Sequence, residues 1–208
     1  YVPMTEGGAM RLLDDRYGMT GALKRFDTEK DDTFRVTTED DRGFILKVAN
    51  PDEPFKEIDF QNSLLRYVET RDPTLPIPRI IHSDDGDDIF QIKDVDGSQR
   101  CVRLLTFLKG TPLDETQSDS QGRVQIGKML ARLRYATEGF THEVEDRYYG
   151  WDVQHLLTLE HLLHEVDDDT HRHALTQGLE RFRQIEVKLR QCRKQVLHND
   201  FSKSNIIV

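Results

Sequence analysis

The sequence has few cysteines and no long apolar stretch, and each shortage excludes a class of protein. The two cysteines, Cys101 and Cys192, lie far apart and lack the spacing of metal ligands. This pattern excludes a disulfide framework and suits a reducing cytoplasm, where we expect the protein to be located. No apolar run approaches membrane-spanning length and no signal peptide is visible, so we expect no membrane partner.

Basic residues are also fewer than acidic residues in this sequence. The 208 residues include 29 Lys and Arg against 38 Asp and Glu, which gives a formal net charge of −9. A general nucleic-acid binder needs a basic surface, so we expect no nucleic-acid partner. An acidic surface suits a cationic small substrate, although ordinary solubility explains the charge equally well.

The first half of the chain predicts a sheet. A helix is expected at residues 9–17, where Gly18 is placed to end it, and a longer helix at about residues 56–69. Stretches with strand character, several of them joined by acidic turns, lie at residues 21–26, 33–37, 43–48, 80–81, 89–92 and 101–105. We predict a five-stranded, mostly antiparallel sheet, with the longer helix inserted after the third strand.

The second half predicts helices. After Gly110-Thr-Pro112 breaks the chain, apolar stripes predict helices around residues 126–133, 151–166 and 170–193. We therefore expect an α+β, two-lobed fold. A sheet lobe would occupy residues 1–107, and a mainly helical, incomplete lobe would occupy residues 108–208.

The end of the chain holds the strongest chemical pattern. A polar loop with His198, Asp200 and Asn205 lies between two segments of strand character, residues 196–197 and 206–208. Its H-x-D-x-x-x-x-N spacing is that of a kinase catalytic loop, in which the Asp accepts a proton from the substrate hydroxyl and the Asn holds a metal ion. Asp200 is thus the candidate base and Asn205 the candidate ligand of Mg²⁺, which accepts neutral oxygens. His198 completes the candidate catalytic loop by bracing it.

A lysine on the third strand, Lys47, is a candidate phosphate ligand. Its neighbours favour burial, so its ammonium must find a partner. In kinases a lysine on this strand binds the α/β-phosphates; taken alone, a lysine at an exposed strand edge is the more common explanation. Glu57 and Gln61 lie four residues apart on the following helix, and one of them should face Lys47. Gln61 is the better placed, and an ordinary polar helix face is the alternative.

Two further segments are candidates for nucleotide binding. The turn at residues 28–34, with Asp31 and Thr33, would cover the phosphates; it is not glycine-rich, and a plain acidic hairpin loop is the alternative. The linker at residues 102–113 would read a base edge with its backbone N–H and C=O groups. A plain connection between lobes is the alternative there. Its candidate contacts are Thr106, Phe107 and Leu108.

With these residues, the chain resembles the aminoglycoside phosphotransferase family, which are small-molecule kinases with a protein-kinase-like fold. It looks closest to the hydroxylysine-kinase-like branch, which includes phosphotransferase domains fused to class III aminotransferases. The Arg-Leu-Leu-Thr-Phe-Leu segment and the His-Asn-Asp loop are the most specific matches. The matching segments keep the family's order over nearly the whole chain: residues 28–34, 44–47, 60–62, 103–113, 151–152 and 196–205.

The resemblance implies transfer of the γ-phosphoryl group of ATP or GTP to a hydroxyl group of an amine-bearing metabolite, hydroxylysine- or aminoglycoside-like. Lys47 would bind phosphates, Asp200 would be the base and Asn205 would bind one Mg²⁺. The family's other metal-binding Asp would follow Val208, so the sequence as given is expected to be a fragment or to be inactive. Fusion to, or association with, further domains is also implied.

A second function stays open, namely a nucleotide-binding regulatory or pseudokinase module without transfer activity. The missing second Asp and the neutral Gln61 favour it. A protein kinase is disfavoured, because the loop lacks His-Arg-Asp and the phosphate-covering turn lacks glycines.

Overall fold

The computed structural model describes residues 1–28 and 30–208 of the chain. Glu29, which belongs to the predicted phosphate-covering turn, lies outside the described residues. The chain forms two compact units, residues 1–144 together with 201–208, and residues 145–200. The lobe boundary predicted at residues 107–108 is a different division of the chain and stays a prediction.

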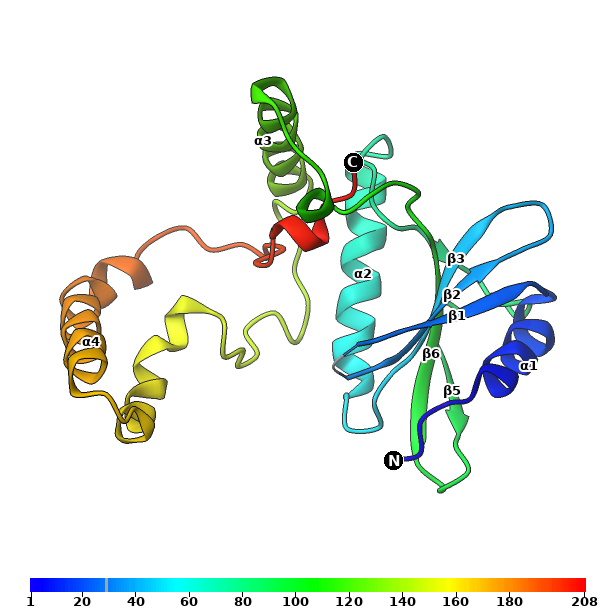
Figure 1. The fold of residues 1–208 in the computed structure, drawn as a ribbon, viewed down its shortest axis with the longest axis horizontal. Helices are drawn as coiled ribbons and strands as arrows, with labels where there is room; N and C mark the ends of the chain where they lie inside the picture. The colour runs from blue at the N-terminus through cyan, green and yellow to red at the C-terminus, as the bar shows by residue number, and fades with distance from the viewer. Residues whose placement is uncertain (29) are drawn as a thin grey trace. The chain divides into compact units, whose positions relative to one another are not determined.

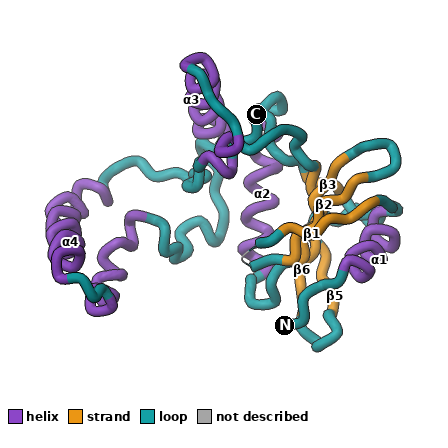
Figure 2. The backbone as a smooth tube through the Cα atoms, in the orientation of Figure 1, coloured by secondary structure: helices purple, strands orange, loops and turns teal. Residues whose placement is uncertain are grey.

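One antiparallel sheet forms the centre of the first unit (Figure 2). The strand order is β1-β2-β3-β6-β4, and β5 also pairs with β6. The predicted α+β fold is confirmed, with six strands instead of five because the short β4 and β5 pair with different parts of β6. The strands are β1 (Ala22–Phe26), β2 (Asp32–Thr37), β3 (Gly43–Val48), β4 (Ile80–Ile81), β5 (Phe90–Lys93) and β6 (Gln99–Thr106).

Two helices, α1 (Glu6–Tyr17) and α2 (Phe55–Arg71), lie on opposite sides of the sheet (Figure 1). The Thr5 side chain caps α1 by accepting a hydrogen bond from a backbone N–H of the first turn. Gly18 ends α1 in the left-handed conformation, with φ 56°, which confirms the predicted stop. Three residues at helical spacing bury one face of α1 against the sheet: Ala9, Leu13 and Tyr17.

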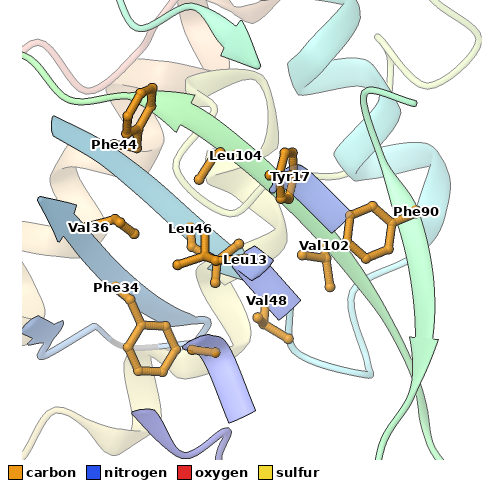
Figure 3. Packing of buried hydrophobic residues seen from close by; sticks show 11 residues of the cluster. Leu13, Tyr17, Phe34, Val36, Phe44, Leu46, Val48, Phe90, Val102 and Leu104 are labelled. Atoms are coloured by element: carbon orange, nitrogen blue, oxygen red, sulfur yellow. The ribbon is translucent and has the colours of Figure 1, made fainter. Parts of the chain in front are cut away.

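Alternation along the strands separates an apolar face of the sheet from a polar one. Lys47 on β3 lies between Leu46 and Val48, which are both buried on the α1 side, so it points to the other side. Thr33 on β2 and Arg103 on β6 stand opposite Lys47 in the strand register and therefore share its face. Figure 3 shows the apolar cluster, which includes Leu13, Tyr17, Phe34, Val36, Phe44, Leu46, Val48, Phe90, Val102 and Leu104.

A buried ion pair joins Asp32, the first residue of β2, to Arg100 on β6. The Arg100 guanidinium lies 2.7 Å from the Asp32 carboxylate and 2.9 Å from that of Asp94, and both Asp32 and Arg100 side chains are fully buried. Arg100 also donates to the carbonyl oxygens of Val48 and Ala49. Burial alone lowers the pKa of Arg100, but the hydrogen bonds to Asp94 and Asp32 outweigh that effect and raise it.

The rest of the chain is largely helical, as predicted. The helix predicted around residues 151–166 is a 3₁₀-helix, and Asp168 caps the α-helix that follows by accepting a hydrogen bond from the backbone N–H of His171. Among the described helices, none is long and apolar enough to cross a membrane. The elements are η1 (Leu113–Glu115), α3 (Ser120–Ala136), η2 (Val153–Glu165), α4 (Asp169–Arg190) and η3 (Lys203–Asn205).

The strand character predicted on both sides of the polar C-terminal loop is not realised as strands. Residues 196–197 have no regular structure, and in residues 206–208 a single β-bridge joins Ile207 to Pro112. A strand exists only where a neighbouring strand supplies hydrogen-bond partners, so apolar β-branched sequence alone does not form one.

Replacing Arg100 with Met should strongly destabilise the fold. Asp32 would then keep a fully buried carboxylate with only the partly exposed Arg25 as a cationic partner, and removing one side of a buried pair costs up to about 3–5 kcal/mol. Chemical denaturation monitored by circular dichroism would measure the loss.

The matched control is Arg42→Met, because Arg42 pairs with the exposed Asp40 and should leave stability nearly unchanged. Equal effects of the two substitutions would contradict a structural role for the buried pair.

Candidate active site

Lys47 forms an ion pair with Asp31, the residue just before β2. The Lys47 Nζ lies 3.0 Å from one Asp31 carboxylate oxygen, and the two side chains are 29% and 16% exposed. The other carboxylate oxygen accepts a hydrogen bond from the backbone N–H of Asn50 at 3.2 Å. The structure thus brings together two of the predicted nucleotide-binding residues, and Asp31 is held at both of its oxygens.

Two polar residues of α2 are bonded to Arg103. The Gln61 side-chain oxygen accepts from the Arg103 guanidinium, and the Asn62 side-chain oxygen accepts from it at 2.8 Å. The Asn62 amide nitrogen in turn donates to the Asp88 carbonyl oxygen at 3.2 Å. The role of orienting Lys47, predicted for Glu57 or Gln61, stays a prediction, since the cation that Gln61 binds through this hydrogen bond is Arg103.

Arg103 is a functional candidate to which the sequence reasoning assigned no role. It is 4% exposed, and the acceptors of these hydrogen bonds are neutral amide oxygens. Burial lowers the pKa of Arg103, and the Asp31 carboxylate is the first of the groups that act against this. The sequence feature that could have identified Arg103 is its position inside the apolar run Val102-Arg-Leu-Leu105, where a charged side chain must be compensated.

Thr33 completes a row of polar residues across β2, β3 and β6 with Lys47 and Arg103. Its side-chain hydroxyl is buried, and no hydrogen-bond partner for it is found among the described residues. A buried hydroxyl without a partner is uncommon, because its desolvation is not compensated. Thr33 therefore adds a hydroxyl whose desolvation is uncompensated, among the described residues, to this face.

The linker after β6 begins with two bonded residues and continues with residues whose backbone groups have no partner among the described residues. Thr106 exchanges hydrogen bonds with Arg79, and the Phe107 N–H donates to the Gly43 carbonyl oxygen at 2.9 Å. The Arg35 guanidinium also lies over the Phe107 ring, 4.2 Å from the ring centroid. In the described part of the chain, by contrast, neither the N–H nor the C=O of the half-buried Leu108 has a hydrogen-bond partner.

The linker is also bonded to the segment that follows Asn205. Thr111 and Val208 exchange backbone hydrogen bonds of 2.9 and 3.0 Å. Gly110, with φ 148°, permits this close approach, because an added Cβ would lie 2.4 Å from the Ile207 side chain and 2.7 Å from the Val208 carbonyl oxygen. Asn205 itself ends η3 and donates its N–H to the Ser202 carbonyl oxygen.

His198 and Asp200 belong to the second unit, where the backbone turns sharply between them. Asn199 has φ 58°, a conformation in which Asn is enriched. The Asp200 N–H donates to the His198 Nδ1 at 3.3 Å, and the Asn199 side chain donates to the Trp151 carbonyl oxygen at 3.4 Å. The first of these bonds fits the bracing role predicted for His198, and the catalytic roles of His198, Asp200 and Asn205 stay predictions.

Known proteins with related sequences and folds include phosphotransferases. Hydroxylysine kinase of Mus musculus is 25% identical over 224 residues, which cover 98% of this chain and 58% of that protein. The chain thus spans little more than half the length of this relative. Two solved structures share the fold. One is an amicoumacin kinase in complex with AMP-PNP, Ca²⁺ and Ami, with a TM-score of 0.64 and 18% identity, over 91% of this chain and 55% of that one. The other is a spectinomycin phosphotransferase in complex with ADP and spectinomycin, with a TM-score of 0.67 and 12% identity, over 100% of this chain and 66% of that one.

The sequence pattern of the phosphotransferase enzyme family matches residues 23–208, which include the sheet, the linker and the C-terminal loop. The chain belongs to the phosphotransferase enzyme family.

Proposed function

We propose that the protein is a small-molecule kinase that transfers the γ-phosphoryl group of ATP or GTP to a hydroxyl group of an amine-bearing metabolite. The observation that carries the proposal is the row formed by Thr33, Lys47 and Arg103. It places two cations and a buried hydroxyl without a described partner on one face of the sheet. Phosphate groups require such donors, because their charge must be compensated when water is excluded.

In this proposal, the nucleotide lies along the polar face of the sheet. Lys47 binds its phosphates, and the turn before β2 covers them. The base lies at the linker, where the backbone N–H and C=O of Leu108 are available to read its edge. Thr106 and Phe107 position Leu108 through their bonds to Arg79 and Gly43.

The transfer step uses the C-terminal loop. Asp200 accepts the proton of the attacking hydroxyl group, while His198 holds the loop and Asn205 offers an oxygen to Mg²⁺. The described residues include no group of three His, Cys, Asp or Glu side chains that could bind a metal ion. Mg²⁺ is usually bound through one or two protein oxygens, phosphates and water, and Asn205 would supply one of those oxygens. When bound, the ion neutralises the charge that develops on the phosphoryl group.

The acceptor is proposed to be a hydroxylated amine. The mouse relative is a hydroxylysine kinase, and the related structures are those of an amicoumacin kinase and a spectinomycin phosphotransferase. The net charge of −9 is compatible with a cationic substrate, which an acidic surface attracts at long range.

A nucleotide-binding module without transfer activity is the second candidate. The observation in its favour is Gln61, a neutral residue that is bonded to Arg103, where a carboxylate would orient Lys47 more strongly. Such a module would bind nucleotide without consuming it.

A nucleotide-consumption screen of the whole protein against hydroxylated amino acids and amino alcohols tests the proposal. We expect consumption of ATP or GTP that depends on one acceptor and on Mg²⁺. Nucleotide binding in calorimetry without any consumption would instead support the second candidate.

Asp200→Asn should abolish transfer and spare nucleotide binding. The amide cannot take up the hydroxyl proton, so the catalytic rate should fall at least about 10²-fold, the contribution of a general base. Nucleotide affinity measured by calorimetry should stay near that of the wild type. Retained turnover in this variant would show that Asp200 is not the base.

Gly110→Ala should impair turnover through the C-terminal loop. The new methyl group would push residues 207–208 away from the linker, and Asn205 would move with them. A displacement of about 1 Å can cost about 10²-fold in rate, so we expect reduced turnover and a lower melting temperature.

Gly178→Ala is the control, because no atom of the described residues lies within 4 Å of a Cβ added at this position on α4. It should leave both measurements unchanged or raise the melting temperature slightly, as expected for alanine in a helix. Equal turnover and equal melting temperature in the two alanine variants would show that the close approach at Gly110 does not affect function.

A further inference from the structure

Asp31 acts on both cations of the polar row, Lys47 and Arg103. One of its oxygens lies 3.0 Å from the Lys47 Nζ, and its charge favours the cationic form of Arg103, which stands opposite Lys47 in the strand register. The other oxygen is fixed by the Asn50 N–H at 3.2 Å. The carboxylate is therefore held in place from the end of β3 while it acts on the two cations.

On α2, Gln61, which was predicted to orient Lys47, and its neighbour Asn62 are bonded to a different cation. Gln61 and Asn62 both use their side-chain oxygens for the Arg103 guanidinium. Asn62 is buried and is also bonded to the Asp88 backbone. These bonds join α2 to β6 without supplying a negative charge to Lys47.

Asp31 is placed by its neighbour in the chain. Asp32 is fully buried, bonded to Arg100 at 2.7 Å, and accepts from the Met4 N–H at 2.8 Å. Because successive residues point to opposite sides of a strand, a fixed Asp32 directs Asp31 away from the apolar core. The position of the Asp31 carboxylate thus follows from the register of β2.

From this arrangement, and on the basis of the proposed function, we propose that Asp31 is the positioning residue that holds Lys47 for the nucleotide phosphates, in place of a side chain of α2. The sequence predicted Asp31 as a direct contact of the nucleotide. A carboxylate and a phosphate repel each other, whereas a lysine between them attracts both. The turn before β2, and not a movement of α2, then determines whether Lys47 is in place.

The first test measures the exposure of the Lys47 amine to a soluble amine-directed reagent, with labelled peptides quantified by mass spectrometry. In Asp31→Asn the ammonium loses its charged partner, so labelling of Lys47 should accelerate by about tenfold, as expected for loss of a charged hydrogen bond. Lys24, an exposed residue of β1, serves as the reference in the same protein. Asp40→Asn, in the neighbouring hairpin turn, is the control and should leave the Lys47 rate unchanged.

The second test measures nucleotide binding and kinetics in the whole protein. Asp31→Asn should weaken ATP or GTP binding about tenfold, and Asp31→Glu, which keeps the charge, should restore part of it. Asp40→Asn should bind as the wild type does. Tighter nucleotide binding in Asp31→Asn would mean that Asp31 competes with the phosphates, and would overturn the proposal, as would unchanged labelling of Lys47.

Lys47→Met separates this proposal from the proposed function. If it binds nucleotide as tightly as the wild type, Lys47 is no phosphate ligand and the proposed function fails at this residue, whatever the labelling shows. If Lys47→Met weakens binding and Asp31→Asn does not, the phosphate role of Lys47 stands and the positioning role of Asp31 is refuted.

Discussion

The buried pair of Asp32 and Arg100 is the interaction on which the rest of the first unit depends. Two full charges removed from water are tolerated only when both are well bonded. In this pair Arg100 reaches two carboxylates and two carbonyl oxygens, and Asp32 also binds the backbone of Met4. These bonds join the N-terminal segment, the start of β2, the end of β3 and the β5–β6 hairpin at one point.

The same ion pair also fixes which side chains of β2 lie on each face of the sheet. With Asp32 fixed on the α1 side, Phe34 and Val36 follow it into the apolar core, and Thr33 is left on the other face. Strand pairing then sets Lys47 beside Thr33, and Arg103 beside Lys47. One buried ion pair in the core thus helps to set which polar groups lie on the face that is proposed to bind a nucleotide.

Local features of the fold were predictable from the sequence, and contacts that depend on register were not. Gly18 as a helix stop acts through its immediate neighbours. The pairing of Lys47 with Asp31 depends on how β2 and β3 are aligned, so a helix partner such as Gln61 was the expectation. The segment at residues 196–197 shows the same limit, since strand character without a partner strand produced no strand.

In the proposed function, the linker connects base recognition to the loop that would hold the metal. Leu108 offers backbone groups at one end, and two residues later Gly110 lets residues 207–208 lie directly against the chain. Because Asn205 is only two residues before Ile207, a shift of the linker would be passed on to the candidate metal ligand. A side chain at position 110 would therefore separate the linker from the segment that follows the candidate metal ligand.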